Sequence, residues 1–97
     1  DYVTAYIKIA NAYAAASASC GTTDFEKAAV YLVAVDKFEK AKSVDPSFES
    51  EASQLISRYS AYFPNNEAAF FEGYTDGKSY TVGCWINETT TVRTKKQ

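Results

Sequence analysis

The sequence predicts a single, mainly α-helical domain that ends in a β-hairpin. Two observations carry this prediction. Between residues 2 and 63, apolar side chains recur every three or four positions in three successive segments, the spacing of one face of a helix. After residue 78 they recur every second position, the spacing of a strand. A chain of 97 residues can bury one modest core, so residues 1–97 are expected to form one domain.

The first helix is predicted near residues 2–19. One row of its apolar face repeats at steps of four, three and four and consists of Tyr2, Tyr6, Ile9 and Tyr13. Alanines dominate residues 12–18, and their small side chains allow a neighbouring helix to approach closely. Gly21 follows, and glycine is common just after the end of a helix.

The second helix is predicted near residues 24–44. Thr23 and Glu26 match the capping box, in which the hydroxyl and the carboxylate bond backbone N–H groups that the first turn leaves without partners. The segment after Thr23 is apolar nearly all round, which indicates a central helix covered on more than one side. Asp36 and Lys40 have the spacing of an ion pair on one helix face.

A third helix is predicted near residues 47–63, because Asp45 followed by Pro46 is a typical helix start. Its amphipathic pattern is the clearest in the chain and predicts that Leu55 and Ile56 are core residues. Such a helix would lie against the second helix through its apolar face.

The last third of the chain predicts a short helix near 66–73, capped by Asn65 or Asn66, and a hairpin near 78–94 with its turn at Asn87–Glu88. One face of the hairpin shows Tyr80, Val82, Cys84 and Ile86, and Trp85 faces the other way. A lone hairpin is only marginally stable in water, so the apolar face is expected to pack on the helices.

Composition argues against several classes of function. The net charge is −2 with interspersed signs, so nucleic acid is not an expected partner. The basic residues Arg93, Lys95 and Lys96 are interpreted as a solvated tail. No apolar run approaches the ~20 residues that a membrane-spanning helix needs. There is no His, no cluster of metal ligands and no glycine-rich phosphate loop, so we expect no enzyme activity, no metal and no cofactor.

Cys20 and Cys84 admit two interpretations. A hairpin lying across the end of the first helix would bring the two sulfurs together, and the resulting disulfide would restrict the unfolded chain. Such bonds persist in oxidising compartments, which favours the periplasm or the cell surface. The alternative is two free, buried thiols, because free cysteine is among the most buried residue types.

The second helix and its exit resemble a tetratricopeptide repeat. The resemblance rests on an aromatic, a small residue, an aromatic, a small residue and a proline at the family's offsets, here Tyr31, Ala34, Phe38, Ala41 and Pro46. Ile9, Ala10 and Tyr13 match the preceding helix of the repeat more loosely. The chain departs from the family between Tyr13 and Ala34, which are about a dozen residues further apart than the repeat has them. Extended helices or an insertion at 17–23 would account for the difference.

The resemblance implies an antiparallel helix pair with a capping third helix over residues 1–64, followed by the short helix and hairpin over 65–97. The whole is similar to the C-terminal segment of tetratricopeptide proteins from Gram-negative cell envelopes. It implies that the chain belongs to a larger repeat protein and serves as a non-catalytic scaffold or interaction module for a protein or peptide.

Two sets of aromatic residues are candidate binding residues. Tyr2, Tyr6 and Tyr13 would line the concave groove of a repeat if their row faces outward; otherwise they are core residues. Trp85 beside Gly83 could stack on a sugar ring, which gives the alternative function of a carbohydrate- or peptidoglycan-associated domain. A Trp85 ring packed on the third helix would remove that mechanism.

Overall fold

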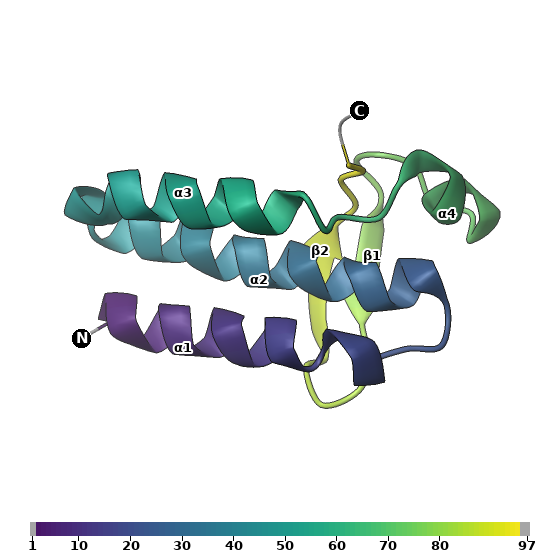
Figure 1. The fold of residues 1–97 in the computed structure, drawn as a ribbon, viewed down its shortest axis with the longest axis horizontal. Coiled ribbons are helices and arrows are strands. Elements are labelled where there is room, and N and C mark those ends of the chain that lie inside the picture. The colour runs from purple at the N-terminus through teal and green to yellow at the C-terminus, as the bar shows by residue number, and fades with distance from the viewer. Residues whose placement is uncertain (1, 96–97) are drawn as a thin grey trace.

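The computed structural model describes residues 2–95 and confirms the mainly helical fold with a C-terminal hairpin (Figure 1). Along the chain the elements are α1 (Tyr2–Ala15), the 3-10 turn η1 (Ser17–Ser19), α2 (Asp24–Val44), the 3-10 turn η2 (Pro46–Phe48), α3 (Glu49–Ser60), α4 (Asn66–Phe71), β1 (Ser79–Val82) and β2 (Glu88–Thr91). The connection between α1 and α2 contains the 3-10 turn η1, and α2 itself is 21 residues long.

The three long helices lie side by side with α2 in the middle, and neighbouring helices run in opposite directions (Figure 1). The two strands pair antiparallel and cross one end of α2, so that the hairpin loop reaches the end of α1 (Figure 1). α2 contacts every other element, which is why it is apolar nearly all round.

The start of α2 has the predicted capping box. The backbone N–H of Glu26 donates to Thr23 Oγ1 over 3.1 Å, and the backbone N–H of Thr23 donates to Glu26 Oε1 over 3.2 Å. Gly21 lies directly against this box, since a Cβ atom there would be 2.4 Å from the Cβ of Glu26. Close approach of the turn to α2 is thus the reason for glycine at this position.

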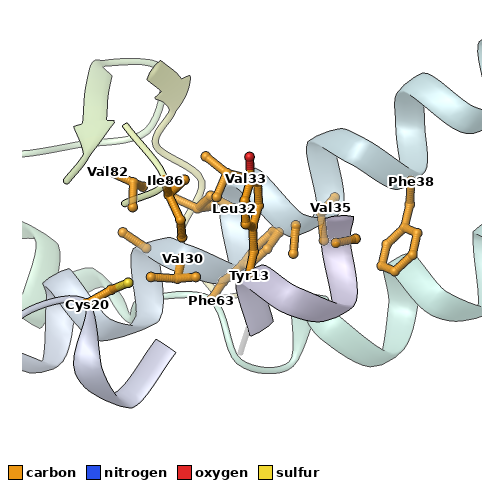
Figure 2. Packing of buried hydrophobic residues seen from close by; sticks show 13 residues of the cluster. Tyr13, Cys20, Val30, Leu32, Val33, Val35, Phe38, Phe63, Val82 and Ile86 are labelled. Atoms are coloured by element: carbon orange, nitrogen blue, oxygen red, sulfur yellow. The ribbon is translucent and has the colours of Figure 1, made fainter. Parts of the chain in front are cut away.

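The main core lies between α2, the end of α1 and the hairpin, where Figure 2 shows Tyr13, Val30, Leu32, Val33, Val82 and Ile86. Phe38 and Ala41 are fully buried. Leu55 and Ile56 are not full core residues as predicted but are half-buried at its edge. The reason is that α3 lies at one side of the helix layer and packs mainly on α2, leaving its opposite side in water.

The third helix starts and ends differently from its prediction. Pro46–Phe48 form a 3-10 turn, in which Asp45 Oδ1 accepts from the backbone N–H of Ser47 over 3.0 Å, and α3 proper ends at Ser60. Asn65, not Asn66, caps α4 by accepting from the backbone N–H of Ala68 over 2.7 Å.

The predicted turn at Asn87–Glu88 is wrong. Glu88 already pairs with Val82 across the hairpin, so the loop consists of residues 83–87. Two loop residues have left-handed backbone conformations, Cys84 with φ 51° and Asn87 with φ 49°. The apolar alternation through Cys84 and Ile86 resembles a continuing strand, but these conformations bend the chain instead.

Candidate functional site

Trp85 is exposed on a loop that is held in place on both sides. Its side chain is 61% exposed, while Val82 and Ile86 are buried. Within the loop, the backbone N–H of Asn87 donates to the carbonyl of Gly83 over 3.2 Å. A rigid loop therefore presents a large aromatic ring to solvent, and this ring does not pack on α3.

Tyr13 of α1 lies against Trp85 and is itself a core residue. The ring centroids are 5.4 Å apart and the ring planes are inclined by 58°. Tyr13 is only 7% exposed, so it supports the Trp85 ring and offers little surface of its own. The two rings do not form a coplanar platform, and any stacking ligand would meet the Trp85 ring alone.

A polar network adjoins this aromatic pair. The Tyr13 hydroxyl donates to Glu88 Oε2, and Lys37 Nζ lies 2.9 Å from Glu88 Oε1. Burial, the hydrogen bond to Glu88 and the charge of Glu88 raise the pKa of Tyr13 to about 12. Burial opposes ionisation of Glu88, but the bond from Tyr13 and the Lys37 ammonium outweigh it, so the pKa of Glu88 is lowered. The network is charged and partly accessible beside Trp85.

Cys20 and Cys84 form a disulfide bond, with their Cα atoms 5.4 Å apart. The structure therefore agrees with the first interpretation of the two cysteines, a disulfide between the end of α1 and the hairpin. The bond joins the turn after α1 to the residue next to Trp85. A disulfide is consistent with an oxidising compartment outside the cytoplasm.

The predicted tyrosine row does not form one surface. Tyr6 is half-buried against a cluster that includes Ala41 and Ala52, and it lies seven positions, roughly 10 Å along the helix, from Tyr13. The side chain of Tyr2 lies outside the described residues. The structure thus brings Tyr13 and Trp85 together but leaves Tyr6 with the interface of α1, α2 and α3.

Other tyrosines join the three helices. The Tyr59 hydroxyl of α3 donates to Asn11 Oδ1 of α1 over 3.1 Å. Tyr31 of α2 stacks on Tyr62, with ring centroids 5.0 Å apart. Part of the high tyrosine content therefore serves to connect helices.

Arg93 is not part of a solvated tail, contrary to its prediction. Its Nη2 donates to Asp36 Oδ1 over 2.8 Å and to the carbonyl of Leu32 over 3.2 Å, and the guanidinium lies over the ring of Phe63. Asp36 thus pairs with Arg93 in place of the predicted Lys40. Lys95 is exposed, and Lys96 lies outside the described residues.

Sequence reasoning also missed the two phenylalanines of α4. Phe70 is 73% exposed and Phe71 is 85% exposed, the highest values among the large hydrophobic side chains described. The signal was the pair of neighbouring aromatics between Glu67 and Glu72, because the four consecutive apolar residues 68–71 go all the way round a helix and cannot share one side.

Within residues 2–95, no three His, Cys, Asp or Glu side chains are arranged so that they could hold a metal ion. None of the helices in this described part has the length and apolar character needed to cross a bilayer. Comparisons of the chain with models of protein families, with curated proteins and with solved structures gave no match.

Proposed function

We propose that this chain is a non-catalytic protein-interaction module that forms the C-terminal capping region of a tetratricopeptide array in the cell envelope. The observation that carries the proposal is the difference between the two outer helices. α1 exposes Ala5, Ile9 and Ala12, which are spaced by four and three residues and so share one face. α3 exposes a polar face made of Glu49, Glu51, Ser53, Ser57 and Arg58.

Such an asymmetry fits the end of an array. Repeat modules bury their apolar faces against their neighbours, and the terminal unit needs a polar outer face. The α1 face is suited to the docking of a preceding helix, because Ala5 and Ala12 permit close approach. The α3 face and the hairpin are suited to contact with water.

The packing around α2 supports the same proposal. Ala34 and Ala41, two positions of the repeat resemblance, are fully buried. Ile7 of α1 and Leu55 of α3 both pack on the cluster that contains Ala41. Small residues on a central helix that two others approach are what a helix–turn–helix array requires. The disulfide supports an oxidising location such as the periplasm or the cell surface.

Cross-linking in the native polypeptide tests the proposal. Lys8 is exposed on α1, and an amine-reactive cross-linker applied to protein from its native compartment should join Lys8 to a preceding helical repeat. The sequence on the N-terminal side of Asp1 should then show a period of about 34 residues. Ile9→Glu should abolish the cross-link, whereas Arg58→Glu on the polar face of α3 should not. A native polypeptide in which the cross-linker attaches to Lys8 but its second end is always hydrolysed would exclude the array.

The exposure of Trp85 favours a second candidate function, binding of a carbohydrate. The ring is held rigidly beside the Glu88–Lys37 pair, so a pyranose stacked on it would meet an acceptor and a donor for its hydroxyls. Trp85 is the only tryptophan of the chain, so intrinsic fluorescence reports on this ring alone. Titration with N-acetylglucosamine tetramers should shift its emission if the function is correct, and unchanged emission at millimolar sugar would exclude it.

A further inference from the structure

The helix α4 buries its small side chains and exposes its large ones. Ala69 is 1% exposed and lies in a cluster with Phe25 and Val92. Phe70 and Phe71, the next two residues, are 73% and 85% exposed. This reverses the usual amphipathic arrangement, in which the large apolar side chains face the core. The fold gains little burial from the two rings, so their exposure calls for an explanation outside the isolated chain.

Phe70 stands between two shallow hollows. One hollow of about 540 Å³ is lined by Asn66, Glu67, Phe70 and Phe71. The other, of about 290 Å³, is lined by Asn66, Phe70, Tyr74, Thr75, Asp76 and Thr94. Because both include Asn66 and Phe70, they form one continuous surface along α4. We call these lining residues the α4 surface.

The edges of the α4 surface are acidic. Glu67 lines one hollow and Asp76 the other, and Glu72 follows Phe71 directly. In the part of the chain that the structure describes, no basic side chain lines either hollow. Lys78 is nearby, but its Nζ lies 3.4 Å from the carbonyl of Gly73, to which it donates. The surface therefore combines an apolar centre with negative edges.

We propose that the α4 surface binds a basic amphipathic helix of a partner protein. The apolar side of that helix would cover Phe70 and Phe71, and its Lys or Arg side chains would approach Glu67 and Asp76. Aromatic anchors surrounded by polar groups are typical of binding hot spots, and complementary charge directs the encounter. This inference goes beyond the proposed function, because it assigns a partner class to a surface that the array does not use.

Charge also distinguishes this partner from the other occupants of an apolar surface. A second copy of the chain would bring its own acidic edges against the same edges, and like charges placed together oppose association. An anionic membrane would repel these carboxylates for the same reason. A basic helix satisfies both the apolar centre and the negative edges.

A labelled peptide tests the proposal directly. The probe is a fluorescein-labelled helical peptide of Leu and Lys, about 14 residues long so that it can form a helix on binding. We expect saturable anisotropy changes with the full chain, and a loss of affinity of about tenfold or more for the Phe70→Ser/Phe71→Ser variant. Val44→Ser is the matched control, because Val44 is also exposed, at 45%, but lies at the far end of α2.

Further measurements make the test specific. Replacing Lys by Glu in the peptide should abolish binding, and Glu67→Gln should weaken it and reduce its salt dependence. Equal binding of the two peptides, or unchanged binding by the phenylalanine variant, would overturn the proposal. A dimer that depends on Phe70 and Phe71, with no peptide binding, would overturn the proposal in favour of self-association. Adsorption to phosphatidylcholine vesicles that depends on the same two residues, again with no peptide binding, would overturn it in favour of a membrane.

The proposed function and this inference fail separately. Ile9→Glu alters the α1 face and should leave peptide affinity unchanged. If Lys8 forms no cross-link but the peptide still binds, only the array is refuted. If Lys8 forms the cross-link but the peptide does not bind, only the proposal for the α4 surface is refuted.

Discussion

Arg93 and Asp36 form a salt bridge of 2.8 Å that ties the segment after β2 to the middle of α2. The same guanidinium also donates to the carbonyl of Leu32 and lies over the Phe63 ring. One side chain therefore connects the end of the hairpin to α2 and to the segment after α3.

Replacing Arg93 by Ala should lower the free energy of unfolding by about 1–2 kcal/mol, because charge-assisted hydrogen bonds are lost at a partly exposed site. Arg93→Lys should recover less than half of the loss, since an ammonium cannot reproduce the fork of the guanidinium. Urea denaturation measures both. Lys95→Ala is the control and should change stability little. An equal loss of stability in Lys95→Ala would show that Arg93 acts only through the positive charge of this segment and not through its specific contacts.

Replacing Gly21 by Ala should cost about 1–3 kcal/mol, because the added methyl group would overlap the Cβ of Glu26 and displace the capping box. Gly83→Ala is a suitable comparison, because a Cβ there meets nothing within 4 Å. That variant should stay within about 0.5 kcal/mol of the original chain. Thermal unfolding followed by circular dichroism measures the difference. Similar melting temperatures for both variants would contradict the role assigned to Gly21.

Removing the disulfide by Cys20→Ser/Cys84→Ser should destabilise the chain by about 4 kcal/mol in the chain-entropy model, because the bond closes a loop with a sequence separation of 64. Urea melts of the original chain and the variant measure this loss. Thiol titration of denatured, non-reduced protein from its native compartment should find no free thiol. Two free thiols per chain would contradict both the bond and the inferred oxidising location.

The contribution of Glu88 should depend on pH. Its pKa is lowered in the folded state, so its stabilisation is fully present above the unfolded pKa of about 4.3 and is lost as pH falls through the lower folded pKa. The stability difference between the original chain and Glu88→Gln should be constant near pH 6 and shrink below about pH 4. Melting temperatures across this range measure it. Glu49→Gln, at an exposed position on α3, is the control, and a matching pH dependence there would remove the special role of Glu88.

Much of the helical part could be predicted because its signals are local. Thr23 with Glu26, Asp45 with Pro46, and the spacing of apolar residues each specify a boundary or a face within a few positions. The bounds of α2 agree with the prediction. The hairpin turn was misplaced, because Ile86 continues the apolar alternation although the chain bends at Cys84 and Asn87.

The candidate surfaces were less predictable, because they depend on contacts distant in sequence. Arg93 lies 57 positions from Asp36, and a sequence alone does not indicate which acid it meets. In α4, the hydrophobic pattern does not distinguish a helix that buries Phe70 from one that buries Ala69. Trp85 is exposed, but it lies in the loop at 83–87 and not on a face of a strand, and its neighbour Tyr13 comes from α1.

The central position of α2 has a consequence for the order of folding. α1, α2 and α3 follow one another along the chain and can meet with little loss of loop entropy, whereas the hairpin must close long loops back to Cys20 and Asp36. We therefore expect the helices to associate in the rate-limiting step and the hairpin to dock afterwards. Until the hairpin docks, Phe25 and Leu32 are expected to remain exposed to water. The associated helices would then have an exposed apolar face, and aggregation through this face would compete with docking of the hairpin.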